Sequence, residues 1–111
     1  MTTFFVPGVP RPKARPRVVA GHAYTPRGTR EWEQLVRMHY HGPLYEGDVA
    51  VRMTFLMPTR RRVDLDNLAK ACADALNKKA YHDDGQIVRM ELARIVDRDN
   101  PGVQICIEEA T

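Results

Sequence analysis

A regular alternation of apolar and polar side chains marks one stretch near the middle of the chain. Over residues 48–57, every second position from Val49 to Met57 is apolar, and Arg52 and Thr54 lie between these positions. Successive side chains of a strand point to opposite faces, so this spacing gathers the apolar set on one face. The pattern predicts a β-strand with one buried face.

Two other stretches carry apolar residues at the three- and four-residue spacing of an amphipathic helix. The first helix is predicted over residues 26–41, where Thr25 precedes a proline at the start and Gly42-Pro43 ends the pattern. The second helix is predicted over residues 65–78. Its apolar stripe consists of Leu65, Leu68, Ala69, Cys72, Ala75 and Leu76.

The last quarter of the chain contains two further β-prone stretches, residues 86–97 and 103–108. They are joined by Asp99-Asn100-Pro101-Gly102, whose residue types favour a reversal of direction, so we predict an antiparallel hairpin. Together the elements predict one domain over residues 1–111 with an α+β fold. This fold is a small, largely antiparallel or mixed sheet with two main helices packed against it.

The first 17 residues read as an extended arm. Residues 3–6 are β-prone, but four prolines between positions 7 and 16 exclude a helix and any central strand through residue 17. Basic residues recur at every second position, which makes a basic stripe if the backbone is strand-like. A polyproline helix would instead spread them around its axis. The four basic residues are Arg11, Lys13, Arg15 and Arg17.

Length and composition narrow the class of protein. With 111 residues, 43% of them hydrophobic, one small domain is expected, and dimerisation would enlarge its limited core. The chain has no apolar run long enough to span a membrane and no secretory leader, so we expect an intracellular protein. Cys72 and Cys106 lack metal-binding or disulfide spacing and are expected to be small buried apolar residues.

Charge is unevenly distributed along the sequence. Residues 1–30 carry six basic side chains and no acidic one, whereas the remaining 81 carry 11 basic and 14 acidic side chains. Because no basic amphipathic helix accompanies this charge, an anionic polymer suits it better than a membrane surface. Nucleic acid is the leading partner, and a merely solubilising basic terminus is the alternative.

Acidic residues cluster around the start of the second predicted helix and again before the next strand. Asp64 and Asp66 face one side only if the chain is still extended there, and Asp83-Asp84-Gly85 is a turn-like segment that could meet them. Gathered carboxylates repel one another unless a cation lies between them, and Mg²⁺ prefers oxygen ligands. A divalent ion would activate water for phosphodiester hydrolysis, with Lys70 stabilising charge on the phosphate.

The same residues also have ordinary structural explanations. An aspartate before a helix is a common cap, and Asp-Gly is a common turn. Asp74, on the polar face of the helix, is more readily explained as an ion-pair partner of Lys70 or Lys78 than as a metal ligand.

The order of these motifs resembles the RusA family of Holliday-junction resolvases. The specific part is residues 62–88, with Asp64-Leu-Asp66-Asn67, a lysine one turn later and an Asp83-Asp84 pair. The resemblance implies a homodimeric, Mg²⁺-dependent endonuclease, with Mn²⁺ able to substitute. It would bind four-way DNA junctions in the cytoplasm of a bacterium or phage-infected cell and resolve them by paired nicks during recombination and repair.

Carried over by position, the resemblance implies that Asp64, Asp66 and Asp84 bind the metal and that Lys70 is catalytic. Asn67 and Asp83 would have supporting roles. We expect DNA contacts from the arm residues Arg11, Lys13, Arg15 and Arg17 and from Arg60, Arg61 and Arg62, although an arginine triplet can also be a solvated loop. The alternatives are a less selective flap or fork nuclease and a non-catalytic DNA-binding module.

Overall fold

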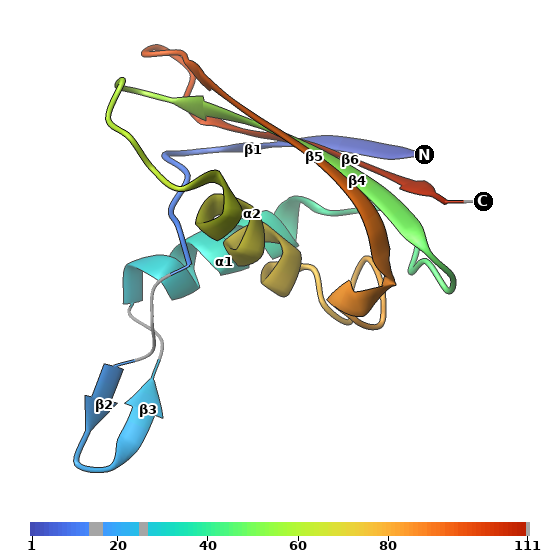
Figure 1. Ribbon diagram of the computed structural model, residues 1–111, viewed down its shortest axis with the longest axis horizontal. Coiled ribbons are helices and arrows are strands. Elements are labelled where there is room, and N and C mark those ends of the chain that lie inside the picture. Colours follow the sequence, from blue (N-terminus) through green and yellow to red (C-terminus); the bar gives the residue numbers. More distant parts are fainter. Residues whose placement is uncertain (14–16, 25–26, 111) are drawn as a thin grey trace.

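A four-stranded sheet with both helices packed on one face forms the body of the protein (Figure 1). The computed structural model describes residues 1–13, 17–24 and 27–110. The strand order is β1-β6-β4-β5, and β2 and β3 form a separate small hairpin. The elements are β1 (Thr2–Pro7), β2 (Arg17–Val19), β3 (His22–Tyr24), α1 (Arg27–His39), β4 (Val49–Met57), α2 (Leu65–Ala75), the 3₁₀ turn η1 (Asp84–Gln86), β5 (Ile87–Val96) and β6 (Gly102–Glu109).

The predicted central strand is confirmed as β4. Val51, Met53 and Phe55 are buried against the helices, whereas Arg52 on the opposite face is exposed. β4 lies between β5 and β6 in the sheet, so its backbone is paired on both edges. The predicted α+β class with a mixed sheet and two helices is therefore also confirmed.

The predicted β5–β6 hairpin is wrong. The chain does reverse between the two strands, but β5 pairs in parallel with β4, and β6 pairs antiparallel with the other edge of β4. The physical reason is the helix between β4 and β5, because a strand-helix-strand unit returns the second strand parallel to the first. β6 then crosses to the opposite edge of the most apolar strand and leaves β5 at the border of the sheet.

Both predicted helices are present, with shifted ends. α1 is described from Arg27 and ends at His39, while the predicted start at Thr25 and Pro26 lies outside the described residues. α2 begins at Leu65 as predicted but ends at Ala75 rather than at residue 78. Its apolar stripe is buried except at Leu65, which is partly buried, and the chain turns sharply beyond the helix, where Lys78 has a φ of 65°.

The last turns of the two helices are joined by hydrogen bonds. Arg37 of α1 donates through Nη1 to the carbonyl oxygens of Ala75 (3.0 Å) and Asn77 (2.7 Å) at the end of α2. Lys79 in turn donates to the carbonyl of Arg37. These bonds satisfy helix-end carbonyls, so α1 fixes the position of α2.

The amino-terminal segment is extended, as predicted, but it is not one continuous arm. β1 pairs antiparallel with β6 at the edge of the sheet, which agrees with the exclusion of a central strand. The β2–β3 hairpin, drawn in blue, projects from the body and turns through Ala20 and Gly21, both with positive φ (Figure 1). The proposed basic stripe includes Arg15, which lies outside the described residues.

Both cysteines are free thiols, as expected from their spacing. Cys72 on α2 is buried, and burial raises the pKa of its thiol to about 12. The prediction that both cysteines are buried is wrong for Cys106 on β6, which is only partly buried because its side chain lies on the sheet face away from the helices. Among the described residues, no helix has the length and apolar character needed to cross a membrane.

Candidate active site

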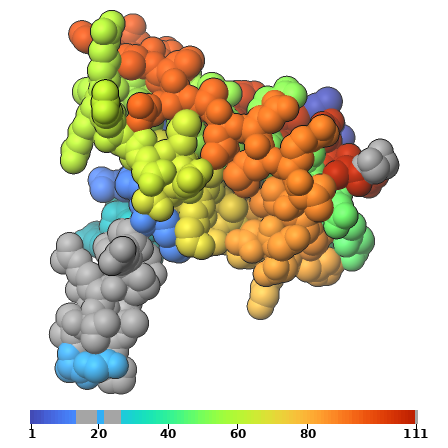
Figure 2. All heavy atoms as spheres, in the orientation of Figure 1, coloured from blue at the N-terminus to red at the C-terminus, as the bar shows by residue number. Residues whose placement is uncertain are grey.

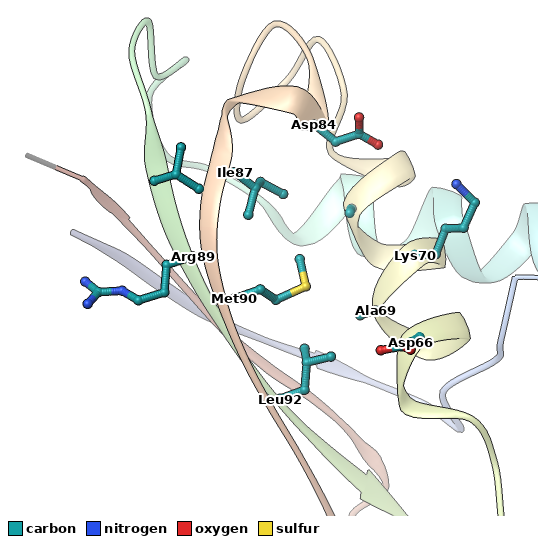
Figure 3. Close-up of a pocket in the computed structure, with 10 residues that line it drawn as sticks. Asp66, Ala69, Lys70, Asp84, Ile87, Arg89, Met90 and Leu92 are labelled. Carbon is teal, nitrogen blue, oxygen red and sulfur yellow. The ribbon is translucent and has the colours of Figure 1, made fainter.

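An open groove of about 450 Å³ runs between α2 and β5. Asp66, Lys70 and Asp84 are among the residues that line it, so three of the four predicted catalytic residues border the same space, although the end of the Lys70 side chain points away from β5 (Figure 3). Its other walls are mainly apolar. They are formed by Ala69 and Ala73 from α2 and by Ile87, Val88, Arg89, Met90 and Leu92 from β5.

Asp64 has a structural position at the start of α2. Its backbone is extended (φ −65°, ψ 117°), and its Oδ1 accepts a hydrogen bond of 2.9 Å from the backbone N–H of Asp66. This is the N-cap arrangement, which satisfies one of the free N–H groups of the first helical turn. Asp64 therefore caps α2, and it does not line the groove in this chain.

Asp83 and Asp84 are neighbours with different surroundings. Asp83 caps η1, where its Oδ2 accepts from the N–H of Gly85 (2.8 Å), while the Oε1 of Gln86 accepts from the N–H of Asp83 (3.1 Å). This reciprocal pair is a capping box. It fixes the turn so that Asp84 lies in the groove, which gives Asp83 a supporting structural part.

The carboxyl group of Asp84 lies in an acidic neighbourhood. Partial burial, hydrogen bonding to Asp74 and repulsion from Asp74 and Asp83 together raise the pKa of Asp84, and Lys70 acts in the opposite direction. Two carboxyl groups in contact are unfavourable while both are charged. The groove thus holds a negative charge that a cation would stabilise.

The structure does not gather the three predicted metal ligands at one point. Among residues 1–13, 17–24 and 27–110, no group of three His, Cys, Asp or Glu side chains is placed to hold a metal ion. Asp84 lies beside Asp74, and Asp74 is eight residues beyond Asp66 on α2, or about 12 Å along the helix axis. Figure 3 accordingly shows Asp66 and Asp84 at opposite ends of the helix, with Lys70 between them.

The donor chemistry nevertheless fits a hard divalent cation. Mg²⁺ is commonly held by only one or two carboxylates, with water and substrate phosphate completing its shell. Asp66 and Asp84 each present a carboxylate to an open, water-accessible groove. Each carboxylate by itself fits such a partial ligand set, in which water and substrate phosphate supply the other ligands.

Asp74 lies beside Asp84 of the groove, which its position in the sequence does not indicate. The predicted pair with Lys70 is confirmed at 3.8 Å, but the nearer ammonium is that of Lys13, 3.2 Å from the same Oδ2. Lys13 also lies 2.6 Å from Glu33 on α1. In the sequence, the place of Asp74 on the polar face of the helix, four residues from both Lys70 and Lys78, indicated an ion pair and gave no sign of Lys13.

Three of the predicted DNA-contacting arginines line a second cavity. This cavity, of about 520 Å³, is lined by Arg11 from the arm and by Arg61 and Arg62 from the segment between β4 and α2. Arg60 is exposed in the same segment. Figure 2 shows this yellow-green segment as a protrusion next to the arm. Cationic side chains from two distant parts of the sequence therefore converge on one surface.

Carboxylates and a lysine that line a groove, together with an arginine-lined surface, are the residue types typical of metal-dependent proteins that cleave phosphodiester bonds. The comparisons with known proteins agree. A family model described as "Endodeoxyribonuclease RusA" matches residues 7–108, so the chain belongs to the RusA family of endodeoxyribonucleases.

Several proteins named "Crossover junction endodeoxyribonuclease RusA" are similar to this chain. The protein of Aquifex aeolicus is 25% identical over 104 residues, which cover 89% of this chain and 82% of that protein. The protein of Escherichia coli (strain K12) is 39% identical over 62 residues, covering 55% of this chain and 52% of its own length. The protein of Enterobacteria phage 82 has the same identity and coverage.

Proposed function

We propose that this chain is a junction-resolving endonuclease that nicks two strands of a four-way DNA junction during recombination and repair. The observation that carries the proposal is the placement of Asp66, Lys70 and Asp84 around one groove in a member of an endodeoxyribonuclease family. The names of the similar proteins support the four-way junction as substrate. The corresponding location is the cytoplasm of a bacterium or of a phage-infected cell, where such DNA is found.

Each site residue has a distinct part in the proposed reaction. Asp66 and Asp84, which line the groove, would each offer a carboxylate ligand for Mg²⁺, which Mn²⁺ could replace, and Asp64 remains a proposed ligand besides its part as the cap of α2. When bound, the ion supplies an acidified water and a polarised phosphoryl oxygen. Lys70, whose side chain is 60% exposed, can place its ammonium against a phosphate and stabilise the charge that develops there.

The arginines are proposed to hold the DNA near a groove that would otherwise repel it. Arg11, Arg61 and Arg62 share one surface, and Arg60 lies beside them. Contacts to phosphates would position the duplex arms without reading their sequence. We also propose that Arg15 and Arg17 of the arm contact the DNA. Lys13 is not proposed as a DNA contact, because its ammonium is paired with two carboxylates.

A homodimer would supply the two equivalent sites that a four-way junction needs, and β5 is our candidate for its interface. β5 borders the sheet, and four of its apolar side chains are exposed: Val88, Met90, Ile95 and Val96. When a two-fold axis relates two antiparallel copies of β5, the paired side chains must point to the same face of the joined sheet. This is possible only in registers in which one residue lies opposite its own copy at the axis.

The charges of β5 favour one such register. With Met90 on the axis, Arg89 of each copy lies opposite Glu91 of the other, and Val88 lies opposite Leu92. With Arg89 or Glu91 on the axis, each charge would face itself, which is unfavourable. The sequence of this strand therefore supports pairing centred on Met90.

The proposed activity is tested with a mobile four-way junction carrying a different label on each strand. Wild-type protein with Mg²⁺ should nick two strands of like polarity, and chelation of the metal should abolish cleavage. Asp66→Asn should abolish cleavage but keep or strengthen junction binding, because it removes one repulsive charge. Linear duplex, flap and fork substrates serve as controls.

Equal cleavage of flaps, forks and junctions would instead favour the less selective nuclease. Tight junction binding by the wild-type protein without any cleavage would favour the binding module. Retained cleavage by Asp66→Asn would remove Asp66 from the reaction.

A further inference from the structure

Lys13 is held at both its backbone and its side chain between the arm and the two helices. Its backbone N–H donates to the carbonyl of Asn67 in the first turn of α2 (2.9 Å). Its Nζ lies 2.6 Å from Oε1 of Glu33 on α1 and 3.2 Å from Oδ2 of Asp74 on α2. The side chains of all three ionic partners are only about one-fifth exposed, at 21%, 19% and 22%.

The same oxygen of Asp74 also attracts Lys70. Lys70 Nζ lies 3.8 Å from Oδ2, whereas Lys13 Nζ lies 3.2 Å from it. Lys13 is thus the nearer of two ammonium groups that share one carboxylate oxygen. Because the stem of Lys70 is flexible and its side chain 60% exposed, its ammonium can either approach Asp74 or extend into the groove.

We propose that Lys13 is a positioning residue for Lys70. By neutralising Asp74, Lys13 weakens the attraction that would draw the Lys70 ammonium back along α2, and so leaves it free for the phosphate. The inference rests on the proposed endonuclease function, in which Lys70 stabilises the developing charge. It gives the lysine of the basic arm a role inside the protein in place of a DNA contact.

Loss of Lys13 should therefore slow cleavage more than it weakens binding. Without the positive charge at position 13, Lys70 would be the remaining one of the two ammonium groups near Asp74 and would form a closer pair with it. A partly exposed ion pair of this kind changes the ratio between the two positions of the Lys70 side chain, paired with Asp74 or extended into the groove, by about three- to fivefold. We expect a loss of that size in kcat with Lys13→Gln, whereas the affinity for the junction should stay within about twofold.

A second substitution separates this role from simple support of the fold. Asp74→Asn removes the competing carboxylate, so in the Lys13→Gln/Asp74→Asn double variant Lys70 should again be free and kcat should return toward the wild-type value. Lys13→Arg should keep most of the activity because it keeps the charge. Glu33→Gln, which removes the other partner of Lys13 and leaves Asp74 neutralised, is the matched control and should change kcat less than Lys13→Gln.

The experiment measures single-turnover cleavage of the four-way junction at saturating protein, junction affinity without divalent metal, and the thermal midpoint of each variant. A second readout does not depend on cleavage: the rate at which Lys70 is acetylated by an N-hydroxysuccinimide ester, followed by mass spectrometry. It should fall in Lys13→Gln and recover in the double variant, since an ion-paired amine reacts more slowly.

The outcomes are distinguishable. Lys13→Gln with wild-type kcat and wild-type acetylation of Lys70 would overturn the inference. A double variant as slow as Lys13→Gln, with both proteins folded, would show that Lys13 acts only as a structural support. If the wild-type protein does not cut junctions, the proposed function fails, and the acetylation rates alone decide whether Lys13 controls Lys70.

Discussion

Reversal of one charge on β5 gives the sharpest test of the proposed dimer. In the pairing centred on Met90, each Arg89 faces the partner copy's Glu91, and the two-fold axis repeats this pair. Arg89→Glu would turn both attractive pairs into repulsive ones. If the chains associate along this edge, the variant should dissociate more readily than the wild type.

The magnitude follows from the geometry of the pair. An opposite-charge cross-strand pair contributes about 0.2–1 kcal/mol, and a like-charge pair costs a similar amount, so reversing two pairs weakens the dimer by about 0.8–4 kcal/mol. Glu91 is already 3.0 Å from Arg52 of its own chain, and both side chains are more than half exposed, at 59% and 64%. This competition favours the lower half of the range, or roughly a tenfold increase in the dissociation constant of the dimer.

Sedimentation velocity over a range of protein concentrations measures that constant directly. Arg98→Glu makes the same charge change just beyond β5 and should leave the dimer unchanged. Arg89→Glu/Glu91→Arg restores opposite charges across the axis and should recover most of the affinity, less the contribution of the lost Arg52 pair. An Arg89→Glu protein that dimerises as well as wild type, or a wild-type chain that stays monomeric at all concentrations, would refute the β5 interface.

Three further predictions concern the site. Asp64→Ala should lower the free energy of unfolding, measured by chemical denaturation, by about 1 kcal/mol because it removes the helix cap, whereas Asp64→Asn should keep the cap. Cleavage by the Asp64→Asn protein would exclude Asp64 as an essential metal ligand. Arg61→Ala/Arg62→Ala should weaken junction binding and reduce its salt dependence by about two phosphate contacts, measured as the slope of log affinity against log salt; an unchanged slope would place the DNA elsewhere. Because the pKa of Asp84 is raised in the folded chain, ionisation of this carboxyl group at pH values above its ordinary pKa of 3.8 destabilises the fold. Asp84→Asn should therefore raise the thermal midpoint of the metal-free protein at neutral pH, and this gain should disappear as the pH falls below 3.8. An unchanged thermal midpoint at neutral pH would contradict the prediction.

Local periodicity explains what could be predicted from the sequence. The alternation over β4 and the apolar stripe of α2 each reflect burial of one face of the element, and such burial can be predicted from the spacing of apolar residues close together in the sequence. The cluster of Asp66 and Lys70 is equally local, since both belong to one helix. The turn-like Asp83-Asp84-Gly85 segment suggested that a carboxylate could meet the first two, but only the resemblance singled out Asp84, because nothing near it in the sequence indicates which aspartate faces α2.

Pairing between distant segments explains what could not be predicted. Which strand borders β5 depends on the crossover through α2 and on competition for both edges of β4, and the turn residues before β6 carry no information on either. The β2–β3 hairpin has Ala20-Gly21 at its turn instead of one of the stronger hairpin dipeptides. The ion pairs of Lys13 join residues 20 and 61 positions apart, so its basic character alone suggested a DNA contact.

The unequal accessibility of the two thiols makes this chain convenient for spectroscopy. Cys72 is enclosed and its thiol stays protonated, whereas Cys106 is partly exposed and lines a shallow hollow with Arg89 and Glu91 on the sheet face away from the helices. A maleimide dye would therefore attach selectively at Cys106 without any engineered cysteine. Self-quenching of that dye would report directly on whether two β5 edges meet, in real time and with the groove left untouched.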